Sequence, residues 1–400
     1  MHQSLLVHLF AFALTGCTTT GKSSPVIAEA DGSVSPDDGG DEPSPPASDT
    51  GPTEDTDDTG TAEDTGIDTD DTGVGSADDT GSDDPTPAPD YSVPGPHNVG
   101  LRTDDFTTGD AVTLWIDVWY PAVGAGSGTA DYYGGPGWIL TGTALQDAEA
   151  VCDSPRPVMV HSHGSNSIRW EMFYLMEHLA SHGWLIAAPD HAGNTYYDAW
   201  GSFDLIYQRR PRDIAAAFDW LLSQSADPSS PLAGCIDPSD GYVASGYSFG
   251  GYTAYAVGGA SVIGASETAD PRATAVVTHA PWNAYGVISE GTGGIDVPVL
   301  TIGGERDDVV GTQYVGLHGA IESTPRAIAS FFDGGHFSPA SIYCGAPGDG
   351  CGDDYIASET YNSIVQTSVL AFIETLRGVD GAWEQLVENP AELTWETVRE

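Results

Sequence analysis

A serine flanked by glycines is the residue of this chain best suited to act as a nucleophile. It lies in the run Gly246-Tyr247-Ser248-Phe249-Gly250, which has the pattern G-x-S-x-G. The residues before this run form a short apolar segment typical of a buried strand, and the small residues after it favour the start of a helix. A sharp turn between a strand and a helix exposes the serine of such a pattern as a nucleophile. The pattern is frequent in a chain with 50 glycines, so an acid and a base must support it.

Two later loops contain the acid and the base that Ser248 needs. Asp307 follows one predicted strand, and His336 follows the next, directly after two glycines. The imidazole takes the hydroxyl proton, and the carboxylate holds the imidazole in the required tautomer. We therefore predict a triad of Ser248, His336 and Asp307 that works through an acyl-enzyme intermediate. Asp308 remains an alternative for the acid.

Two backbone N–H groups are expected to stabilise the oxyanion. One belongs to Phe249, the residue after the nucleophile. The other is assigned to Ser165, which follows a predicted strand; each such donor typically contributes about 3 kcal/mol to the transition state. His161 and His163 have no third ligand in view, so no metal is predicted, and His163 is expected to shape the loop through hydrogen bonds.

Beyond Tyr91 the pattern alternates between strand and helix. The predicted strands are 111–120 (half-exposed), 158–161, 184–188, 242–245, 275–279, 297–302 and 327–332, and the predicted helices are 168–182, 212–224, one starting at 251, and 359–377. Such alternation indicates an α/β protein with a mostly parallel central sheet and helices on both faces. About 300 residues suit one domain of this kind.

Several motifs occur in an order that resembles a known family. They are Trp119-Tyr120-Pro121-Ala122, Val160-His161-Ser162-His163-Gly164, Leu179-Ala180-Ser181-His182-Gly183, Ala188-Pro189-Asp190-His191, Arg210-Pro211-Arg212-Asp213-Ile214, the run around Ser248, and Gly334-Gly335-His336-Phe337. Over residues 92–378 the set is similar to α/β-hydrolases of the predicted dienelactone-hydrolase and platelet-activating-factor-acetylhydrolase type. The resemblance implies an α/β-hydrolase fold and a serine carboxylic ester hydrolase without a cofactor. It assigns the same triad, Ser248, Asp307 and His336, and the same oxyanion donors, Ser165 and Phe249.

The N-terminal part has the composition of an export signal followed by a tether. Residues 1–16 contain a short apolar run and end in Leu14-Thr15-Gly16 before Cys17, which resembles a bacterial lipoprotein signal with Cys17 as the lipidated residue. Residues 17–90 are rich in Asp-Thr-Gly units and are predicted to be a disordered acidic tether. The catalytic domain is expected at 91–400. We therefore expect a lipid-anchored protein of the cell envelope, on the outer membrane or cell surface; an ordinary cleaved signal and secretion are the alternative.

Charge and cysteine content limit which binding partners the protein can have and indicate whether its compartment permits disulfides. The chain has a net charge of −47, which disfavours nucleic acid and direct contact with anionic lipid. The partner is expected to be a small-molecule ester, and the protein a monomer. Apart from Cys17 there are four cysteines, an even number that fits two disulfides in an exported protein. We predict Cys344–Cys351 across a short loop, and Cys152–Cys235 because each precedes one of two strands expected to be parallel neighbours.

The sequence indicates the substrate less clearly than it indicates the triad. The aromatic segment 194–203 and Trp282 follow predicted strands, so they either line an acyl or aromatic pocket or form a packed loop. A serine peptidase on the same scaffold and a non-catalytic surface binding module are the alternatives to an esterase.

Overall fold

Apolar strands in the C-terminal three quarters of the chain pair into one 12-stranded sheet. The computed structural model describes residues 89–400 except 136–137, 200, 267, 346 and 388–389. The described residues belong to one compact unit. The predicted signal peptide, Cys17 and all but the end of the predicted tether lie outside the described residues. No described helix is long and apolar enough to cross a membrane.

The centre of the sheet is parallel, as predicted. The order is β12-β11-β10-β9-β8-β6-β7-β2-β1-β4-β3, with β5 beside β2. Pairs from β11 to β7 along this order are parallel, whereas β12, β2 and β3 pair with their neighbours in antiparallel fashion. The strands are β1 Asn98–Thr107, β2 Thr113–Val123, β3 Thr129–Gly135, β4 Trp138–Gln146, β5 Glu149–Ala150, β6 Val158–Ser162, β7 Leu185–Pro189, β8 Tyr242–Tyr247, β9 Ala273–His279, β10 Val299–Gly304, β11 Arg326–Phe331 and β12 Leu393–Val398.

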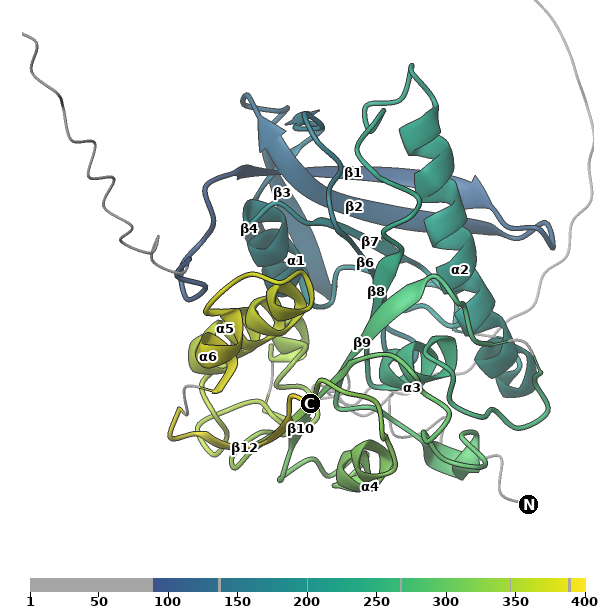
Figure 1. The fold of residues 1–400 in the computed structure, drawn as a ribbon, viewed down its shortest axis with the longest axis vertical. Coiled ribbons are helices and arrows are strands. Elements are labelled where there is room, and N and C mark those ends of the chain that lie inside the picture. The colour runs from purple at the N-terminus through teal and green to yellow at the C-terminus, as the bar shows by residue number, and fades with distance from the viewer. Residues whose placement is uncertain (1–88, 136–137, 200, 267, 346, 388–389) are drawn as a thin grey trace, which may run out of the picture. The chain divides into compact units, whose positions relative to one another are not determined.

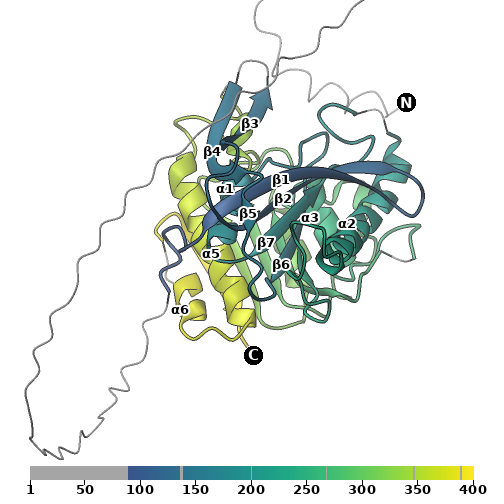
Figure 2. The same ribbon diagram turned by 90° about the horizontal axis from the view of Figure 1, so that it is seen from above.

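Helices cover both faces of the sheet (Figures 1 and 2). Successive residues of β6 point to opposite faces: Met159 joins the core under one set of helices and Val160 the core under the other. The first set is α1 Phe173–Ser181, α5 Ser358–Leu376 and α6 Ala382–Val387, and the second is α2 Phe203–Ala226, α3 Phe249–Val257 and α4 Gln313–Gly319. The chain runs from β6 to its neighbour β7 on one side, and then through α2 to β8 on the other side of β6. The loops that follow β6 and β8 therefore diverge at the carboxyl ends of these strands. Sheets of this kind form their binding sites at such a point.

Three predicted elements need correction. The predicted helix 168–182 begins only at Phe173. The predicted half-exposed strand at 111–120 is β2, which is almost completely buried because it lies between β7 and β1 with both faces covered. The predicted helix 212–224 is the C-terminal part of the longer α2, which already begins at Phe203. Pro211 lies inside α2 and cannot donate to Tyr207 O, and the Tyr252 hydroxyl donates to this carbonyl instead, at 2.9 Å.

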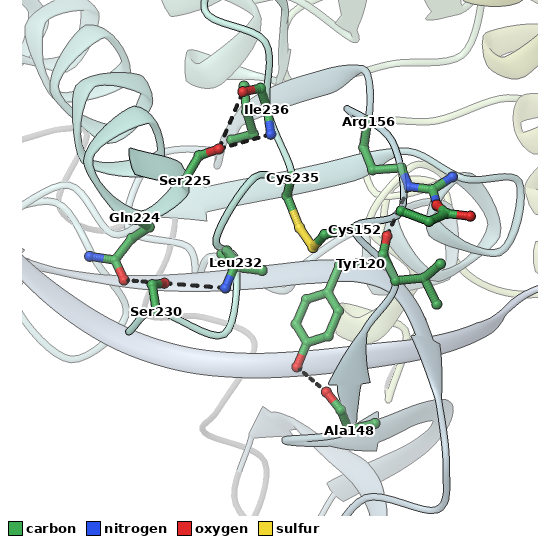
Figure 3. The surroundings of a disulfide bond; sticks show 12 residues. Tyr120, Ala148, Cys152, Arg156, Gln224, Ser225, Ser230, Leu232, Cys235 and Ile236 are labelled. Carbon is green, nitrogen blue, oxygen red and sulfur yellow. Dashed lines mark hydrogen bonds and ion pairs between the residues drawn. A yellow bond between two sulfur atoms is a disulfide. The ribbon is translucent and has the colours of Figure 1, made fainter. Parts of the chain in front are cut away.

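The structure contains both predicted disulfides. Cys152 precedes β6 and Cys235 precedes β8, and since these strands are parallel neighbours their amino ends bring the two Cα atoms to 4.5 Å (Figure 3). Cys344 and Cys351 close a loop after the 3-10 helix Ser341–Tyr343, with Cα atoms 5.2 Å apart.

The start of the described chain is fastened to the last two helices. The Tyr91 N–H donates to Gln385 Oε1 of α6 at 3.0 Å, and Gln385 Nε2 donates to Pro89 O at 2.6 Å. The Thr367 hydroxyl of α5 donates to Tyr91 O at 3.4 Å.

Candidate active site

Ser248 occupies the turn between β8 and α3 in a strained conformation. Its φ is 55° and its ψ −116°, a region that residues with a side chain rarely adopt. The turn is tight: a Cβ at Gly246 would collide with the Gly250 carbonyl, and one at Gly250 with the carbonyl of Ser162. These two glycines therefore permit the approach of α3 to β8 and β6, and the side chain of Ser248 is left at the end of the sheet.

The structure brings the three predicted triad residues together. His336 Nε2 lies 3.0 Å from Ser248 Oγ, and His336 Nδ1 lies 2.8 Å from Asp307 Oδ2. Asp307 Oδ1 accepts from the N–H groups of Val309 and Val310 at 3.0 and 2.7 Å. The Asp307 carboxylate is thus held by its own loop and presents its second oxygen to the imidazole.

The alternative acid, Asp308, is exposed and makes no contact with the imidazole among the described residues. Its N–H instead donates to Asp349 Oδ2 at 2.8 Å, and the carbonyl of Asp349 accepts from Phe337 N at 2.8 Å. Asp349 belongs to the loop closed by Cys344–Cys351. This disulfide loop therefore contacts both the acid loop and the base loop.

The two predicted oxyanion donors are free to receive a ligand oxygen. Among the described residues, no acceptor lies within hydrogen-bonding range of Phe249 N or Ser165 N. The loop before Ser165 is held by a buried carboxyl group, because Gly164 N donates to Glu171 Oε1 at 2.9 Å. His163 also shapes this loop as expected: its Nε2 accepts from His191 N at 3.0 Å, and its Nδ1 lies 2.7 Å from Gly164 O.

A second Ser-His-Asp array lies beneath the first. His191 Nε2 is 2.9 Å from Ser162 Oγ, and His191 Nδ1 is 2.8 Å from Asp213 Oδ2. These side chains are at most 2% exposed, whereas Ser248 is 8% exposed. No substrate reaches Ser162, so the lower array is structural and Ser248 is the accessible serine of the two.

Burial controls the charge of the lower layer, by which we mean the Ser162-His191-Asp213 array together with Glu171, His161 and Arg210. It raises the pKa of Glu171 and of Asp213 to about 8 and lowers the pKa of His161 to about 3. It also lowers the pKa of the Arg210 guanidinium to about 9. At neutral pH the layer consequently contains largely neutral carboxyl and imidazole groups around one cationic arginine.

A cluster of aromatic rings extends from Phe249, the residue after Ser248. Phe203 stacks on Phe249 with ring centres 5.8 Å apart, and Trp282 and Tyr285 meet Phe203 edge to face at 5.9 and 5.5 Å. The backbone N–H of Trp282 donates to Ser248 O at 2.9 Å, which fixes this residue beside the nucleophile.

Part of the predicted pocket segment 194–203 lies elsewhere. Thr195, with other residues of that segment, lines a separate cavity of about 510 Å³ that does not include the triad.

Arg210 is fully buried in the lower layer, although no role was predicted for it from the sequence. One signal was present: Ile206, Arg210 and Ile214 follow at intervals of four residues, which places the arginine on the apolar stripe of α2. A charged residue on such a stripe needs polar partners in the core. Among the described residues, no group of three or more His, Cys, Asp or Glu side chains is arranged to hold a metal ion.

Comparisons with known proteins concern the family and the fold of the chain. The PET hydrolase-like family matches residues 128–342, a range that includes Ser248, Asp307 and His336. A ferulic acid esterase from Streptomyces cinnamoneus superposes with a TM-score of 0.57 at 20% identity, over 76% of this chain and 98% of that chain. At this identity the likeness concerns the fold, and with the family match it confirms the predicted α/β-hydrolase fold. No curated protein matches the chain.

Proposed function

The chain belongs to the PET hydrolase-like family and is a carboxylic ester hydrolase of the serine type, and from this premise we propose that it cleaves esters through Ser248, His336 and Asp307. The observation that carries the proposal is the hydrogen-bonded series Ser248 Oγ, His336 and Asp307 at 3.0 and 2.8 Å, beginning at a strained serine. This is the arrangement that acyl transfer through a serine requires.

In the proposed reaction, His336 Nε2 takes the hydroxyl proton as Ser248 Oγ attacks the ester carbonyl. The N–H groups of Phe249 and Ser165 donate to the oxyanion that forms. His336 then gives its proton to the departing alcohol, which leaves an acyl-enzyme at Ser248. Water, deprotonated by His336, attacks the acyl carbonyl and releases the acid. Asp307 accepts from the imidazole Nδ1–H and stabilises the imidazolium that forms.

We further propose that the acyl group is aromatic. Phe203, Trp282 and Tyr285 form a cluster of rings with Phe249, the residue after Ser248, and aromatic groups prefer such offset or edge-to-face partners. The matched family and the superposed esterase are both named for esters of aromatic acids. An aromatic acyl group would lie against Trp282, whose backbone is already bonded to Ser248.

The proposal is tested with purified protein and a panel of p-nitrophenyl and methyl esters with aliphatic, benzoyl and feruloyl acyl groups. Turnover should be highest for aromatic acyl groups and absent in Ser248→Ala, and a fluorophosphonate should label the wild type alone. Equal rates for Ser248→Ala and wild type would exclude the triad. Cleavage of peptides but not of esters would favour the serine peptidase, and no turnover or labelling would favour the binding module.

We also propose that the enzyme is tethered to the cell envelope through a lipid on Cys17, with residues 17–90 as the spacer. The support is the signal-like start and the acidic, Asp-Thr-Gly-rich composition. Cys17→Ala should move the protein from the membrane fraction to the soluble fraction. A Cys17→Ala protein that stays with the membranes would contradict the lipid anchor.

A further inference from the structure

One arginine lies beneath both segments that would bind the oxyanion. Arg210 of α2 is 0% exposed. Its Nη1 donates to Asn194 Oδ1 at 2.5 Å, its Nε donates to Thr253 Oγ1 at 3.1 Å, and its Nη2 donates to His163 O and, at 3.2 Å, to Ser162 Oγ. The planar guanidinium thus binds groups from three different elements in fixed directions.

Two of these contacts, those to Asn194 and Thr253, lead in one further hydrogen bond to an expected oxyanion donor residue. Asn194 Nδ2 donates to Ser165 Oγ at 3.3 Å, so Arg210 is linked through Asn194 to one donor residue. The Thr253 hydroxyl donates to Phe249 O at 3.0 Å, and the Phe249 ring lies 4.7 Å from the guanidinium carbon. Arg210 is therefore linked to the other donor residue as well.

The charge of this arginine has no close counter-ion. Among the described residues, no carboxylate lies within 4.0 Å of the guanidinium. Its hydrogen-bond partners are neutral, and the neighbouring Glu171 and Asp213 have raised pKa values because they are buried. A cation in a site that excludes water favours negative charge nearby more strongly than it would at the surface.

We propose that Arg210 is a positioning residue of the oxyanion site, which holds the N–H groups of Ser165 and Phe249 at the spacing that the tetrahedral intermediate requires. This inference rests on the proposed ester hydrolysis. It concerns the segments that carry the donors and assigns Arg210 no contact with substrate.

Steady-state kinetics and amide hydrogen exchange of Arg210→Lys and Arg210→Met test the inference. Lysine keeps the charge but cannot bind three elements at once, so we expect kcat to fall at least about tenfold, with KM changed less than about twofold, because the oxyanion forms only in the transition state. Methionine should lower kcat further. Hydrogen exchange should accelerate in both variants at the bonded amides beside the donors, Gly164 N–H, which donates to Glu171, and Gly251 N–H, which donates to Ser248 O.

Tyr255→Phe is the matched control. Tyr255 is also buried, lies in α3 like Thr253, and its hydroxyl is 2.7 Å from Thr301 Oγ1. Its loss removes a buried hydrogen bond from the same helix without touching the Arg210 contacts. This variant should be less stable, with unchanged kcat and unchanged exchange at Gly164.

Two milder variants keep the test decisive if Arg210→Met does not fold. Asn194→Ala cuts the link to Ser165, and Thr253→Val cuts the link to Phe249. Each should lower kcat several-fold and accelerate exchange mainly at the bonded amide beside its own donor, Gly164 for Asn194→Ala and Gly251 for Thr253→Val. Wild-type kcat and exchange in both variants and in Arg210→Lys would overturn the inference. If the wild type cleaves no ester, the proposed function fails, and the exchange measurements still decide whether Arg210 holds the two segments.

Discussion

At the residue scale, two adjacent aspartates have different surroundings. Asp307 is buried, accepts two N–H groups from its own loop and contacts His336. Asp308 is exposed, and it contacts the disulfide loop through its backbone N–H, which donates to Asp349. The sequence could not separate them because both follow the same strand, and only the path of the loop decides which carboxylate turns toward the imidazole.

Asp307→Asn should lower kcat for a good ester by up to about 10⁴-fold, because an amide at this position favours the wrong imidazole tautomer. Asp308→Asn is the matched control, since it changes the same charge one residue away and keeps the N–H bond to Asp349. Its kcat should stay within about twofold of the wild type. Equal losses in the two variants, measured by initial rates, would refute the assignment of the acid.

Glu171 makes stability depend on pH. Burial raises its pKa to about 8, whereas in the unfolded chain it is near the ordinary value of 4.5. The folded state therefore keeps a proton that the unfolded state has lost, so this contribution is complete below about pH 4.5 and is lost as the pH rises toward 8.

Glu171→Gln cannot lose this proton, so the variant should gain stability relative to the wild type as the pH rises from 5 to 8. The relative gain should be at most about 1.4 kcal/mol for each pH unit. Urea unfolding at pH 5, 6.5 and 8 measures it. The exposed Glu359→Gln, at the start of α5, serves as control and should show no such trend. A stability difference that does not change with pH would contradict the raised pKa.

At the element scale, the two disulfides lie at opposite ends of the parallel strands and should have different effects. Cys152–Cys235 joins the amino ends of β6 and β8 across 83 residues. Cys344–Cys351 spans 7 residues and closes the loop of Asp349, which touches the segments of Asp308 and Phe337 next to the triad.

Replacing Cys152 and Cys235 together by alanine should lower the free energy of unfolding by about 4 kcal/mol and leave kcat unchanged, because the cross-link constrains a long loop far from Ser248. Replacing Cys344 and Cys351 together should lower it by only about 2 kcal/mol but reduce kcat. Denaturant unfolding and initial rates on the two double variants test this contrast. A larger loss of kcat in the first variant would contradict it.

The elements that support the triad were predictable, and those at the edges of the sheet were not. Ser248, Asp307 and His336 each follow a short apolar strand, and parallel strands bring such exits to one edge. The residues of the hairpin of β3 and β4 mix polar and apolar types without a strong period, so no strand was predicted there. Residues 168–172 have helical composition, yet they form turns because Ser167 pairs with Thr195 and Gly164 N is bound to Glu171.

At the scale of the whole molecule, negative charge dominates. Residues 91–400 contain 38 acidic and 11 basic side chains, a net charge of −27, and all of the basic ones are arginines. Many of these arginines are used internally, such as Arg169 between Asp117 and Asp190 at 2.9 and 2.8 Å. The surface charge therefore repels itself in the folded state.

Raising NaCl from about 0.05 M to about 1 M should increase the Tm, because the screening length falls from more than 10 Å to about 3 Å. Thermal unfolding followed by circular dichroism tests this, with an equal osmolality of sucrose as the control for solvent exclusion. A Tm that is equal in both salt concentrations, or that rises only as much as in sucrose, would show that self-repulsion contributes little.

The contacts of Tyr91 determine how the domain would respond to mechanical load. A pull on the chain ahead of residue 89 reaches the folded domain first at Pro89 and Tyr91, and from there passes to Gln385 of α6 and Thr367 of α5. Two short hydrogen bonds to one glutamine side chain yield before a sheet of paired strands does. Tension along the N-terminal segment would then release this segment from α6 first, which lengthens the free chain and leaves Ser248, held between β8 and α3, in its geometry.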